Sequence, residues 1–467
     1  VHQFTDSGAV GLIAIDLFAT KVAEVLPKTS IRTVVVVSIW DLLPPLKRFL
    51  VGAVQKYVKK MVPPITFAHT TFRQALAQGA DRIAAGANPK SYAESLNHAS
   101  IAALQYTGGT TGVAKGAVLT HGNLVANTMQ GLEMWKPFLR MGEEVMLTAL
   151  PLYHIFAFTA NLMIFYLAGG RNVLSPSPRP LSNLKTVLLN EPITWFTGVN
   201  TLFAGLMHES WFKEKTNWTL RGPVAGGMAL VPVMGERWEA MTKTPIYQGY
   251  GLTETSPVAT LNPFQRPKRE AIGVPVPGTD VRFVNNEGQD VRAGEVGELW
   301  VKGPQVMQGY WQRPEETAKV LRDGWLATGD IAKMDEDGYI QIVDRKKDMI
   351  LVSGFNVYPN EVEAVIAAHP GVADTAVVGV PDDETGEVVV AFVTKKDPSL
   401  TEEAVRQHCK QSLTGYKVPR MVVFKNDLPK SNVGKVLRKD LRDEAQQAYL
   451  GKKPGLGSRI LGSSPNG

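Results

Sequence analysis

The sequence predicts a multidomain α/β protein that ends in a small, separate α+β unit. Between residues 100 and 260, strand-like segments such as 103–106 and 193–196 alternate with helical stretches, which is the pattern of an α/β sheet. From residue 271 to 344 the pattern changes to short strands with tight turns, which indicates a small all-β subdomain. A run of charges at 344–348 (DRKKD) then marks the boundary to a compact unit of about one hundred residues.

The length and composition agree with a folded multidomain protein. At roughly 100 to 200 residues per domain, the 467 residues suffice for several domains. The net charge of +6 is too small over this length to indicate a nucleic-acid-binding protein unless it is concentrated. The single cysteine, Cys409, cannot form an internal disulfide, so we expect a buried or idle cytosolic thiol and a cytoplasmic location.

The first residues and the last residues show different patterns. Residues 1–11 lack a basic region followed by a long apolar run and do not predict a signal peptide, and we expect an upstream piece to be missing. A hydrophobic element follows a polar turn at residues 6–15, and residues 33–37 (TVVVV) predict a strand. Residues 450–467 are rich in Gly, Ser and Pro, which predicts a disordered tail or a cloning remnant.

Residues 46–62 (LKRFLVGAVQKYVKKMV) predict an amphipathic helix whose apolar residues share one face. An ordinary surface helix that packs on the core is the first interpretation. The alternative is contact with an anionic membrane surface, which would place the protein peripherally on the inner face of the membrane. The basic face supplies five of the six surplus charges: Lys47, Arg48, Lys56, Lys59 and Lys60.

Residues 106–116 (YTGGTTGVAKG) directly follow a predicted strand and have the composition of a phosphate-binding loop. The glycines allow the backbone to approach a ligand closely, the threonines supply hydroxyl donors, and Lys115 supplies a positive charge. The segment is not a Walker A loop, because Lys115 follows Ala114 and precedes Gly116. A nucleotide-binding loop is therefore predicted, with a plain glycine-rich turn as the alternative.

Residues 145–170 contain no charge and are long enough to be considered for a transmembrane helix. Pro151 interrupts them, and several polar residues would face lipid. We therefore predict a buried strand over 145–150, a turn, and a core helix that ends at Ala168. His154 then lies at the start of this helix, just after a strand end, where ligand sites form in α/β proteins. A structural histidine is the alternative.

The region after the charge run predicts a compact α+β unit. Asn360 is the expected N-cap of a helix that ends at Ala368, with Glu363 at the third helical position. Strands are expected over residues 375–380 and 388–394, and a second helix near Thr401.

The glycine-rich segment resembles the signature loop of the adenylate-forming (AMP-binding enzyme) superfamily. Four further motifs that resemble those of the superfamily follow in order: residues 247–255 (YQGYGLTET), 325–330 (WLATGD), 344–357 (DRKKDMILVSGFNV) and 429–435 (PKSNVGK). Together with the segments PLYHIF and KGPQVMQGYWQRP, they resemble the bacterial long-chain-fatty-acid–CoA ligases. The resemblance extends over more than 300 residues.

The resemblance implies a reaction in two halves, with ATP, Mg²⁺ and coenzyme A as cofactors. A fatty-acid carboxylate attacks the α-phosphorus of ATP, and the CoA thiol then attacks the acyl-adenylate. The implied fold has a large N-terminal domain (1–345) of two packed sheets with helices and a small β-barrel subdomain (271–344). A mobile C-terminal domain (346–449) carries the catalytic lysine and rotates between the half-reactions. A homodimer is one further expectation, and no nucleic-acid partner is expected.

The resemblance also implies roles for individual residues. Lys435 bridges the substrate carboxylate and the α-phosphate, Glu254 and Thr107 bind Mg²⁺, and His154 lies beside the acyl carboxylate. The phosphates lie against Tyr106, Thr107, Gly108, Gly109, Thr110, Thr111, Gly112 and Lys115. The adenosine lies against Gly226, Gly227, Gln248, Gly249, Tyr250, Gly251, Thr253, Asp330 and Arg345, with Tyr250 stacked on adenine and Asp330 on the ribose hydroxyls. Lys347 is the hinge, and the face turned to CoA is formed by Ser353, Gly354 and Phe355.

Two alternatives stay open. One is a ligase of the same superfamily that acts on medium-chain or aryl acids. The other is an inactive fragment that keeps only its nucleotide contacts, because members of the superfamily carry an N-terminal segment that this chain lacks.

Overall fold

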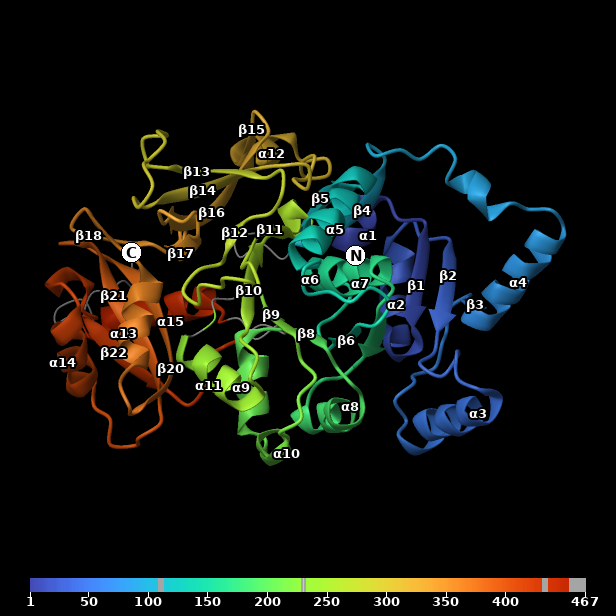
Figure 1. The fold of residues 1–467 in the computed structure, drawn as a ribbon, viewed down its shortest axis with the longest axis horizontal. Coiled ribbons are helices and arrows are strands. Elements are labelled where there is room, and N and C mark those ends of the chain that lie inside the picture. Colours follow the sequence, from blue (N-terminus) through green and yellow to red (C-terminus); the bar gives the residue numbers. More distant parts are fainter. Residues whose placement is uncertain (108–112, 228–229, 231, 431–435, 453–467) are drawn as a thin grey trace, which may run out of the picture. The chain divides into compact units, whose positions relative to one another are not determined.

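The computed structural model describes residues 1–107, 113–227, 230, 232–430 and 436–452 (Figure 1). Contacts within the chain define two units. Residues 1–122 with 308–314 form the first unit, and residues 123–307 with 315–467 form the second.

The first unit contains a parallel sheet of three strands in the order β1-β2-β3. β1 (Gly11–Ile15) and β2 (Thr33–Val37) are joined through helix α2 (Ala19–Val25), and the predicted strand at 33–37 is confirmed. The predicted strand at 103–106 exists as β4 (Ile101–Thr107), but its place in the main α/β sheet was predicted wrongly. It pairs antiparallel with β5 (Lys115–Thr120), and the two strands form a sheet of their own. This unit also contains α1 (His2–Ser7), β3 (Thr70–Thr71) and α4 (Phe72–Ala84).

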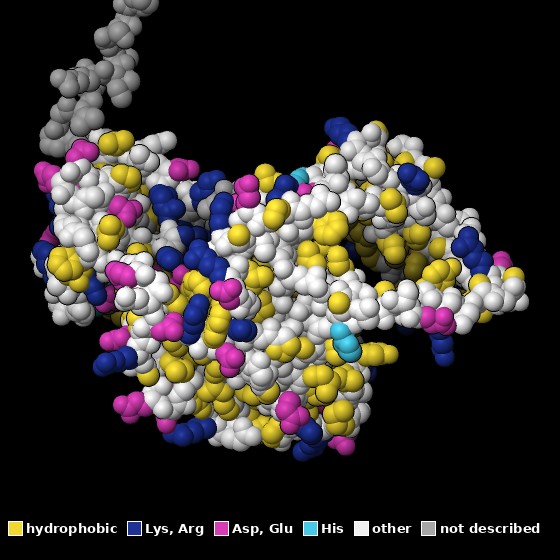
Figure 2. Space-filling view, turned by 90° about the horizontal axis from the view of Figure 1, so that it is seen from above, with side chains coloured by type: hydrophobic (Ala, Val, Ile, Leu, Met, Phe, Trp, Pro, Cys, Tyr) yellow, Lys and Arg dark blue, Asp and Glu magenta, His cyan; other side chains and the backbone are white. Residues whose placement is uncertain are grey.

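The predicted helix at 46–62 is divided into α3 (Pro45–Ala53) and one turn of π-helix (Val54–Val58). Within it only Gly52 is buried, against the indole of Trp40. The expectation that its apolar face packs on the core was wrong, since that face is open to solvent. Exposed large apolar side chains occur elsewhere on the surface as well (Figure 2). On this segment they are Leu46, Phe49, Leu50, Val54, Tyr57, Val58 and Met61.

A seven-stranded sheet in the order β12-β11-β10-β9-β8-β6-β7 forms the centre of the second unit (Figure 1). Strands β6 to β10 are parallel, and β11 and β12 run antiparallel at one edge. The parallel strands are β6 (Val145–Thr148), β7 (Arg171–Leu174), β8 (Trp195–Gly198), β9 (Gly222–Ala225) and β10 (Tyr247–Gly251). The antiparallel ones are β11 (Val258–Leu261) and β12 (Val274–Pro275).

Helices connect these strands and cover their apolar side chains. The uncharged segment forms β6 and then a buried helical run of α6 (Ile155–Ala157), a π-helix (Phe158–Met163) and α7 (Ile164–Leu167), as predicted. No helix in the described residues is long and apolar enough to cross a membrane. The other helices are α5 (His121–Trp135), α8 (Lys185–Asn190), α9 (Asn200–His208), α10 (Ser210–Glu214) and α11 (Pro232–Thr242).

The predicted all-β region forms a five-stranded antiparallel sheet. Between β13 and β14, Asp290 forms an isolated antiparallel bridge with Val284. Helix α12 (Pro314–Val320) precedes β15. The strands are β13 (Asp280–Val284), β14 (Gly297–Lys302), β15 (Leu321–Arg322), β16 (Trp325–Met334) and β17 (Ile340–Arg345).

The C-terminal part combines a five-stranded sheet, ordered β19-β18-β21-β20 with β22 beside β21, with three helices. The expected strands and the helix capped by Thr401 are confirmed. Cys409 is buried in the core, as expected. The strands are β18 (Ile350–Val352), β19 (Phe355–Val357), β20 (Val372–Asp382), β21 (Gly386–Lys395) and β22 (Met421–Lys425), and the helices are α13 (Pro359–Ala367), α14 (Glu402–Ser412) and α15 (Arg438–Lys452).

Two expectations about this part were wrong. Asn360 is not the N-cap of α13, because Pro359 occupies the first helical position and Tyr358 precedes it. The Asn360 N–H instead donates to the carboxylate of Asp344 at 2.7 Å. Helix α15 continues to Lys452, so the predicted tail does not begin at residue 450. Residues 453–467 lie outside the described part of the chain.

Candidate active site

Predicted site residues gather where the parallel strands of the central sheet end. His154 follows β6, Gly226 and Gly227 follow β9, and Gly251 ends β10. Because parallel strands end at one edge, the segments that follow them share that edge, where ligands bind in α/β sheets. A Cβ on Gly226 would lie 2.9 Å from the ring of Phe156, so this glycine lets the backbone pass close to the ring.

His154 is exposed and forms the N-cap of α6. Its Nδ1 accepts a hydrogen bond from the Phe156 N–H at 3.3 Å, which leaves Nε2 as the proton-bearing nitrogen. The histidine is therefore both a structural cap and an exposed imidazole at the carboxyl edge. The two interpretations of the sequence do not exclude each other.

Strand β10 brings four of the predicted adenosine contacts into one short segment. The side-chain amide of Gln248 is buried and bonds to backbone groups of Leu230, Arg269 and Ala271, so it holds neighbouring loops.

The two glycines of this strand are closely packed. A Cβ on Gly249 would lie 2.7 Å from the Leu261 side chain. A Cβ on Gly251 would lie only 1.8 Å from the Pro257 carbonyl oxygen, at a bulge in the pairing of β10 with β11. Only glycine fits at this position.

Asp330 is the centre of a charged cluster. Its carboxylate is buried and accepts a hydrogen bond from the Tyr250 hydroxyl at 2.6 Å. Arg345, its partner across β16 and β17, approaches the other carboxylate oxygen with Nε at 3.2 Å. Burial and the neighbouring Asp330 carboxylate hold the pKa of Tyr250 well above 10, so its hydroxyl stays a donor. Three residues predicted for adenosine are thus in direct contact.

Glu298 on β14 supports this cluster and was not singled out from the sequence. One carboxylate oxygen accepts the Gly329 N–H at 3.2 Å, and the other accepts from Lys346 Nζ at 3.0 Å. Gly329 has a φ of 72°, a conformation that favours glycine. Glu298 therefore fixes the turn that presents Asp330. In the sequence, nothing separates Glu298 from an ordinary polar residue of a strand.

Glu254 lies in a short 3-10 turn, Thr253–Thr255, directly after β10. Its carbonyl oxygen accepts the Met307 N–H at 2.8 Å, and the Thr255 hydroxyl accepts the Leu252 N–H at 2.9 Å. The turn therefore fixes the backbone of both Thr253 and Glu254 at the carboxyl edge of the sheet.

The first unit holds the ends of the predicted phosphate loop. Thr107 and Lys115 are paired across β4 and β5, which closes the base of the loop. The ammonium of Lys115 lies 5.2 Å from the ring centroid of Tyr310. The phenol of Tyr106 donates to Asp6 at 2.7 Å, and burial, reinforced by that carboxylate, raises the pKa of Tyr106 to about 12. Gly108, Gly109, Thr110, Thr111 and Gly112 lie outside the described residues.

The oxygen ligands proposed for Mg²⁺ fit the chemistry of that ion. Mg²⁺ binds through one or two protein oxygens together with substrate phosphates. Glu254 supplies a carboxylate and Thr107 a hydroxyl, each next to a strand end. In the part of the chain that the structure describes, no group of three or more His, Cys, Asp or Glu side chains has metal-binding geometry. Each of these two oxygen donors is therefore of a kind that Mg²⁺ accepts beside phosphate oxygens.

The predicted hinge is a turn after β17. Burial and the nearby Arg345 guanidinium lower the pKa of Lys347.

The residues predicted to face CoA follow the hinge. Ser353 and Gly354 form the two-residue turn between β18 and β19, with φ values of 51° and 82°. Phe355 is exposed and stacks on Tyr416, with ring centroids 4.9 Å apart. The three residues predicted to face CoA thus lie together on one hairpin.

Lys435, the predicted catalytic lysine, lies outside the described residues. The chain on both sides of it is fixed. Lys430 and Val436 form an antiparallel bridge, and the Leu437 N–H donates to the Pro429 carbonyl at 2.8 Å.

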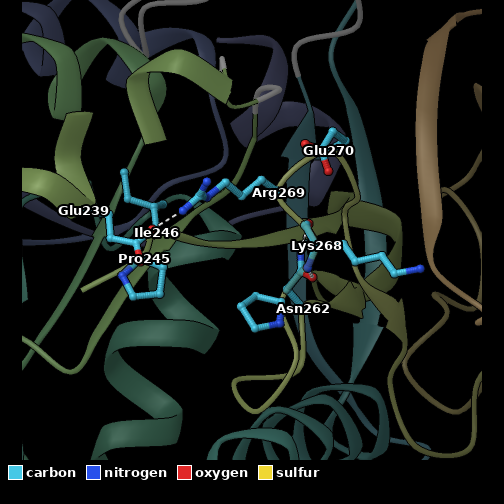
Figure 3. Close-up of a pocket in the computed structure, with 8 residues that line it drawn as sticks. Glu239, Pro245, Ile246, Asn262, Lys268, Arg269 and Glu270 are labelled. Carbon is cyan, nitrogen blue, oxygen red and sulfur yellow. Dashed lines mark hydrogen bonds and ion pairs between the residues drawn. The ribbon is translucent and has the colours of Figure 1, made fainter. Parts of the chain in front are cut away.

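A surface cavity of about 370 Å³ lies elsewhere in the second unit and contains none of the predicted site residues (Figure 3). Ile246 lines it just before β10 begins, so it is at the opposite edge of the sheet from the carboxyl ends. Arg269 points toward Glu239 and pairs with it, whereas Lys268 points away from them (Figure 3). Lys268 pairs with Asp335 and Asp337. These charges are satisfied by protein partners, so the cavity is not the candidate site.

Comparisons with known proteins agree with this geometry. The profile of the "AMP-binding enzyme" family matches residues 1–311, and that of the "AMP-binding enzyme C-terminal domain" matches residues 361–435. A long-chain-fatty-acid–CoA ligase of Yersinia pestis is 50% identical over 445 residues, 95% of this chain and 78% of the relative. One from Bacillus subtilis is 37% identical over 451 residues, 96% of this chain and 79% of the relative.

Two solved structures show the same fold. ATP-bound MatB from Rhodopseudomonas palustris superposes with a TM-score of 0.75 at 28% identity, over 94% of this chain and 90% of that one. The anthranilate CoA ligase AuaEII in complex with anthranoyl-AMP gives a TM-score of 0.76 at 25% identity, over 96% of this chain and 80% of that one.

Proposed function

The chain belongs to the long-chain-fatty-acid–CoA ligases of the AMP-binding enzyme family, and we propose that it converts long-chain fatty acids to acyl-CoA through an acyl-adenylate. ATP, Mg²⁺ and coenzyme A are required, and AMP and pyrophosphate are released. The observation that carries the proposal is the buried Asp330 carboxylate, held by Tyr250 and Arg345 where the second, third and fourth family motifs meet.

The reaction depends mainly on positioning and on stabilisation of negative charge. In the first step a carboxylate oxygen attacks the α-phosphorus, and the bond to the pyrophosphate oxygen breaks. In the second step the CoA sulfur attacks the acyl carbon, the bond to AMP breaks, and the thiol proton is released. Bound Mg²⁺ would neutralise phosphate charge. In our proposal Lys435 and Lys115 stabilise the phosphates, and the Nε2–H of His154 faces the acyl carboxylate.

The same proposal assigns the adenosine to the cluster around Asp330. The carboxylate accepts from the ribose hydroxyls, and Arg345 supplies a planar cation for ribose or phosphate oxygens. Tyr250 presents a ring face to adenine, and the bare backbones of Gly226 and Gly227 leave room beside it. Gln248 acts by holding loops, since its amide is already bonded to backbone groups. We keep the division into residues 1–345 and 346–449, with Lys347 as the pivot, as part of this proposal.

ATP–pyrophosphate exchange with and without palmitate tests the proposal. We expect exchange that depends on palmitate, and acyl-CoA formation once CoA is added. If exchange is faster with medium-chain or aryl acids than with palmitate, those acids, and not long-chain acids, are the substrates. ATP binding without exchange for any of these acids would leave only the inactive-fragment alternative.

We also propose that residues 46–62 contact an anionic membrane surface. The proposal is supported by their exposed apolar side chains, next to the basic face that includes Lys47, Lys59 and Lys60. Such a segment inserts its apolar side and binds anionic headgroups through its cations. Flotation with liposomes should require anionic lipid and should weaken when these cations are changed to Glu. Flotation indifferent to both changes would contradict the proposal. Homodimer formation stays a prediction, to be tested by light scattering.

A further inference from the structure

Asp344, at the end of β17, is a fully buried carboxylate that none of the assignments above uses. One of its oxygens accepts the Arg345 N–H at 2.7 Å, and the other accepts the Asn360 N–H, also at 2.7 Å. The Asn360 side chain returns a bond of 3.3 Å to the Val343 carbonyl. Asn360 is the second residue of α13, so the carboxylate lies at the positive N-terminal end of a nine-residue helix.

Consecutive residues of β17 therefore face two different parts of the protein. Side chains alternate across a strand, so Arg345 reaches the Asp330 cluster and Asp344 reaches α13. Helix α13 is in turn tied to α15, because Glu363 accepts two bonds of 2.8 Å from the Arg438 guanidinium. An unbroken chain of contacts joins the cluster proposed for adenosine to the C-terminal helices through Asp344.

The predicted pivot, Lys347, lies in sequence between two members of this chain of contacts, Asp344 and Asn360. The bond from Asn360 to Asp344 spans the pivot, since the two residues lie on opposite sides of it in sequence. Asp348 lies one residue beyond the pivot and pairs with Arg438 at 3.4 Å and Arg442 at 3.3 Å, both on its own side. Rotation about Lys347 leaves the Asp348 pairs intact and separates Asp344 from α13.

We propose that Asp344 is a positioning residue that holds the C-terminal domain in one of its two catalytic orientations by capping α13 across the pivot. The inference rests on the proposed function, because it requires two half-reactions that use different orientations. Burial raises the pKa of Asp344, even though two backbone N–H groups favour its ionised form. The carboxylate is poorly solvated, so it depends on these two donors, and losing one by rotation changes the balance between the orientations.

Measuring the two half-reactions separately tests the inference. ATP–pyrophosphate exchange with palmitate reports the first, and a single turnover of supplied palmitoyl-AMP with CoA reports the second. In Asp344→Asn an NH₂ group replaces one carboxylate oxygen and faces a backbone N–H, which is also a donor. One of the two hydrogen bonds is therefore lost, while the volume of the side chain is kept. We expect the ratio of the two rates to change by about tenfold or more, and further in Asp344→Ala.

Asp348→Asn is the matched control, since it removes a carboxylate of the same turn whose partners move with it. It should lower the melting temperature and leave the ratio unchanged. The inference is overturned if both half-reactions of Asp344→Asn change by the same factor or not at all, or if the control shifts the ratio equally. If Asp344→Ala does not fold, Asp344→Asn decides alone. Absence of palmitate-dependent exchange in the wild type would instead overturn the proposed function.

Discussion

The Tyr250 hydroxyl donates a 2.6 Å hydrogen bond to the Asp330 carboxylate across 80 residues of sequence. A bond to a charged acceptor is stronger than one between neutral groups. It holds Asp330 in a fixed rotamer beside Arg345. The position of this carboxylate is therefore set before a nucleotide binds.

Tyr250→Phe should lower kcat/KM for ATP by about tenfold to a hundredfold, because a hydrogen bond to a charged group is lost. The effect should appear mainly in KM for ATP, measured by pyrophosphate exchange. Tyr449→Phe is the control, since its hydroxyl donates to Asp382 at 2.8 Å in a buried pair of the C-terminal part. If both variants change KM for ATP alike, the Tyr250 bond has no special role in the site.

Gly251→Ala should destabilise the protein by more than about 3 kcal/mol, beyond the usual cost of an overpacked core. The reason is that the new Cβ meets a backbone oxygen at 1.8 Å, and a backbone atom yields less than a side chain. Gly415→Ala is the matched control, because a Cβ there has no neighbour within 4 Å. Urea unfolding measures both, and equal midpoints would contradict the close approach.

Local patterns in the sequence predicted the elements whose causes are local. The strand at 33–37 follows from five residues of high strand propensity. His154 was placed at the start of a buried helix because Pro151 ends the preceding segment. The family motifs predicted the residues of the Asp330 cluster, although not the bond between Tyr250 and Asp330. These predictions needed no knowledge of distant partners.

The predictions that failed depend on partners far away in the sequence. Asn360 has the side chain of a typical N-cap. In the structure it lies inside the helix, and its N–H donates to the carboxylate of Asp344 on β17. The apolar stripe of residues 46–62 has helical spacing, and spacing does not tell whether another surface covers it. The motif that contains Gln248 likewise did not indicate that three backbone groups bond to its amide, and its contact with adenosine stays a prediction. Such pairings are properties of the tertiary structure.

Glu144→Gln should lower the free energy of unfolding at pH 7 by about 3 kcal/mol, since it leaves Arg221 without its buried partner. Burial opposes ionisation of Glu144, but bonds from Arg221, Thr194 and the Arg140 N–H together outweigh it and lower its pKa. A lowered pKa stabilises the fold above the ordinary carboxylate range, and this contribution is lost as the pH falls through the native pKa.

Denaturant unfolding at several pH values between 7 and 3 checks the effect of Glu144. The difference between wild type and variant should be largest at pH 7 and should shrink below about pH 4.5. Glu191→Gln is the control, because the pair of Glu191 with Arg171 is largely exposed and contributes at most about 1 kcal/mol. A difference that is independent of pH would show that Glu144 acts through packing alone.

The thiol of Cys409 should not react with Ellman's reagent in the native protein at pH 8. Burial raises its pKa to about 11, so about one thiol in a thousand is ionised at that pH, and the core also blocks access. In guanidinium chloride one equivalent should react at once, because the chain has one cysteine. Fast labelling of the folded protein would mean that α14 opens readily.

Lys435→Ala should lower palmitate-dependent pyrophosphate exchange by roughly 10²- to 10³-fold, the effect of removing one preorganised donor at a developing charge. Acyl transfer from supplied palmitoyl-AMP to CoA should change much less, since the α-phosphorus has already reacted. Lys430→Ala is the matched control in the same segment, because Lys430 pairs with Asp374 at 2.7 Å and is assigned no substrate. Near-normal exchange in Lys435→Ala, or an equal loss in Lys430→Ala, would refute the role of Lys435 in adenylation.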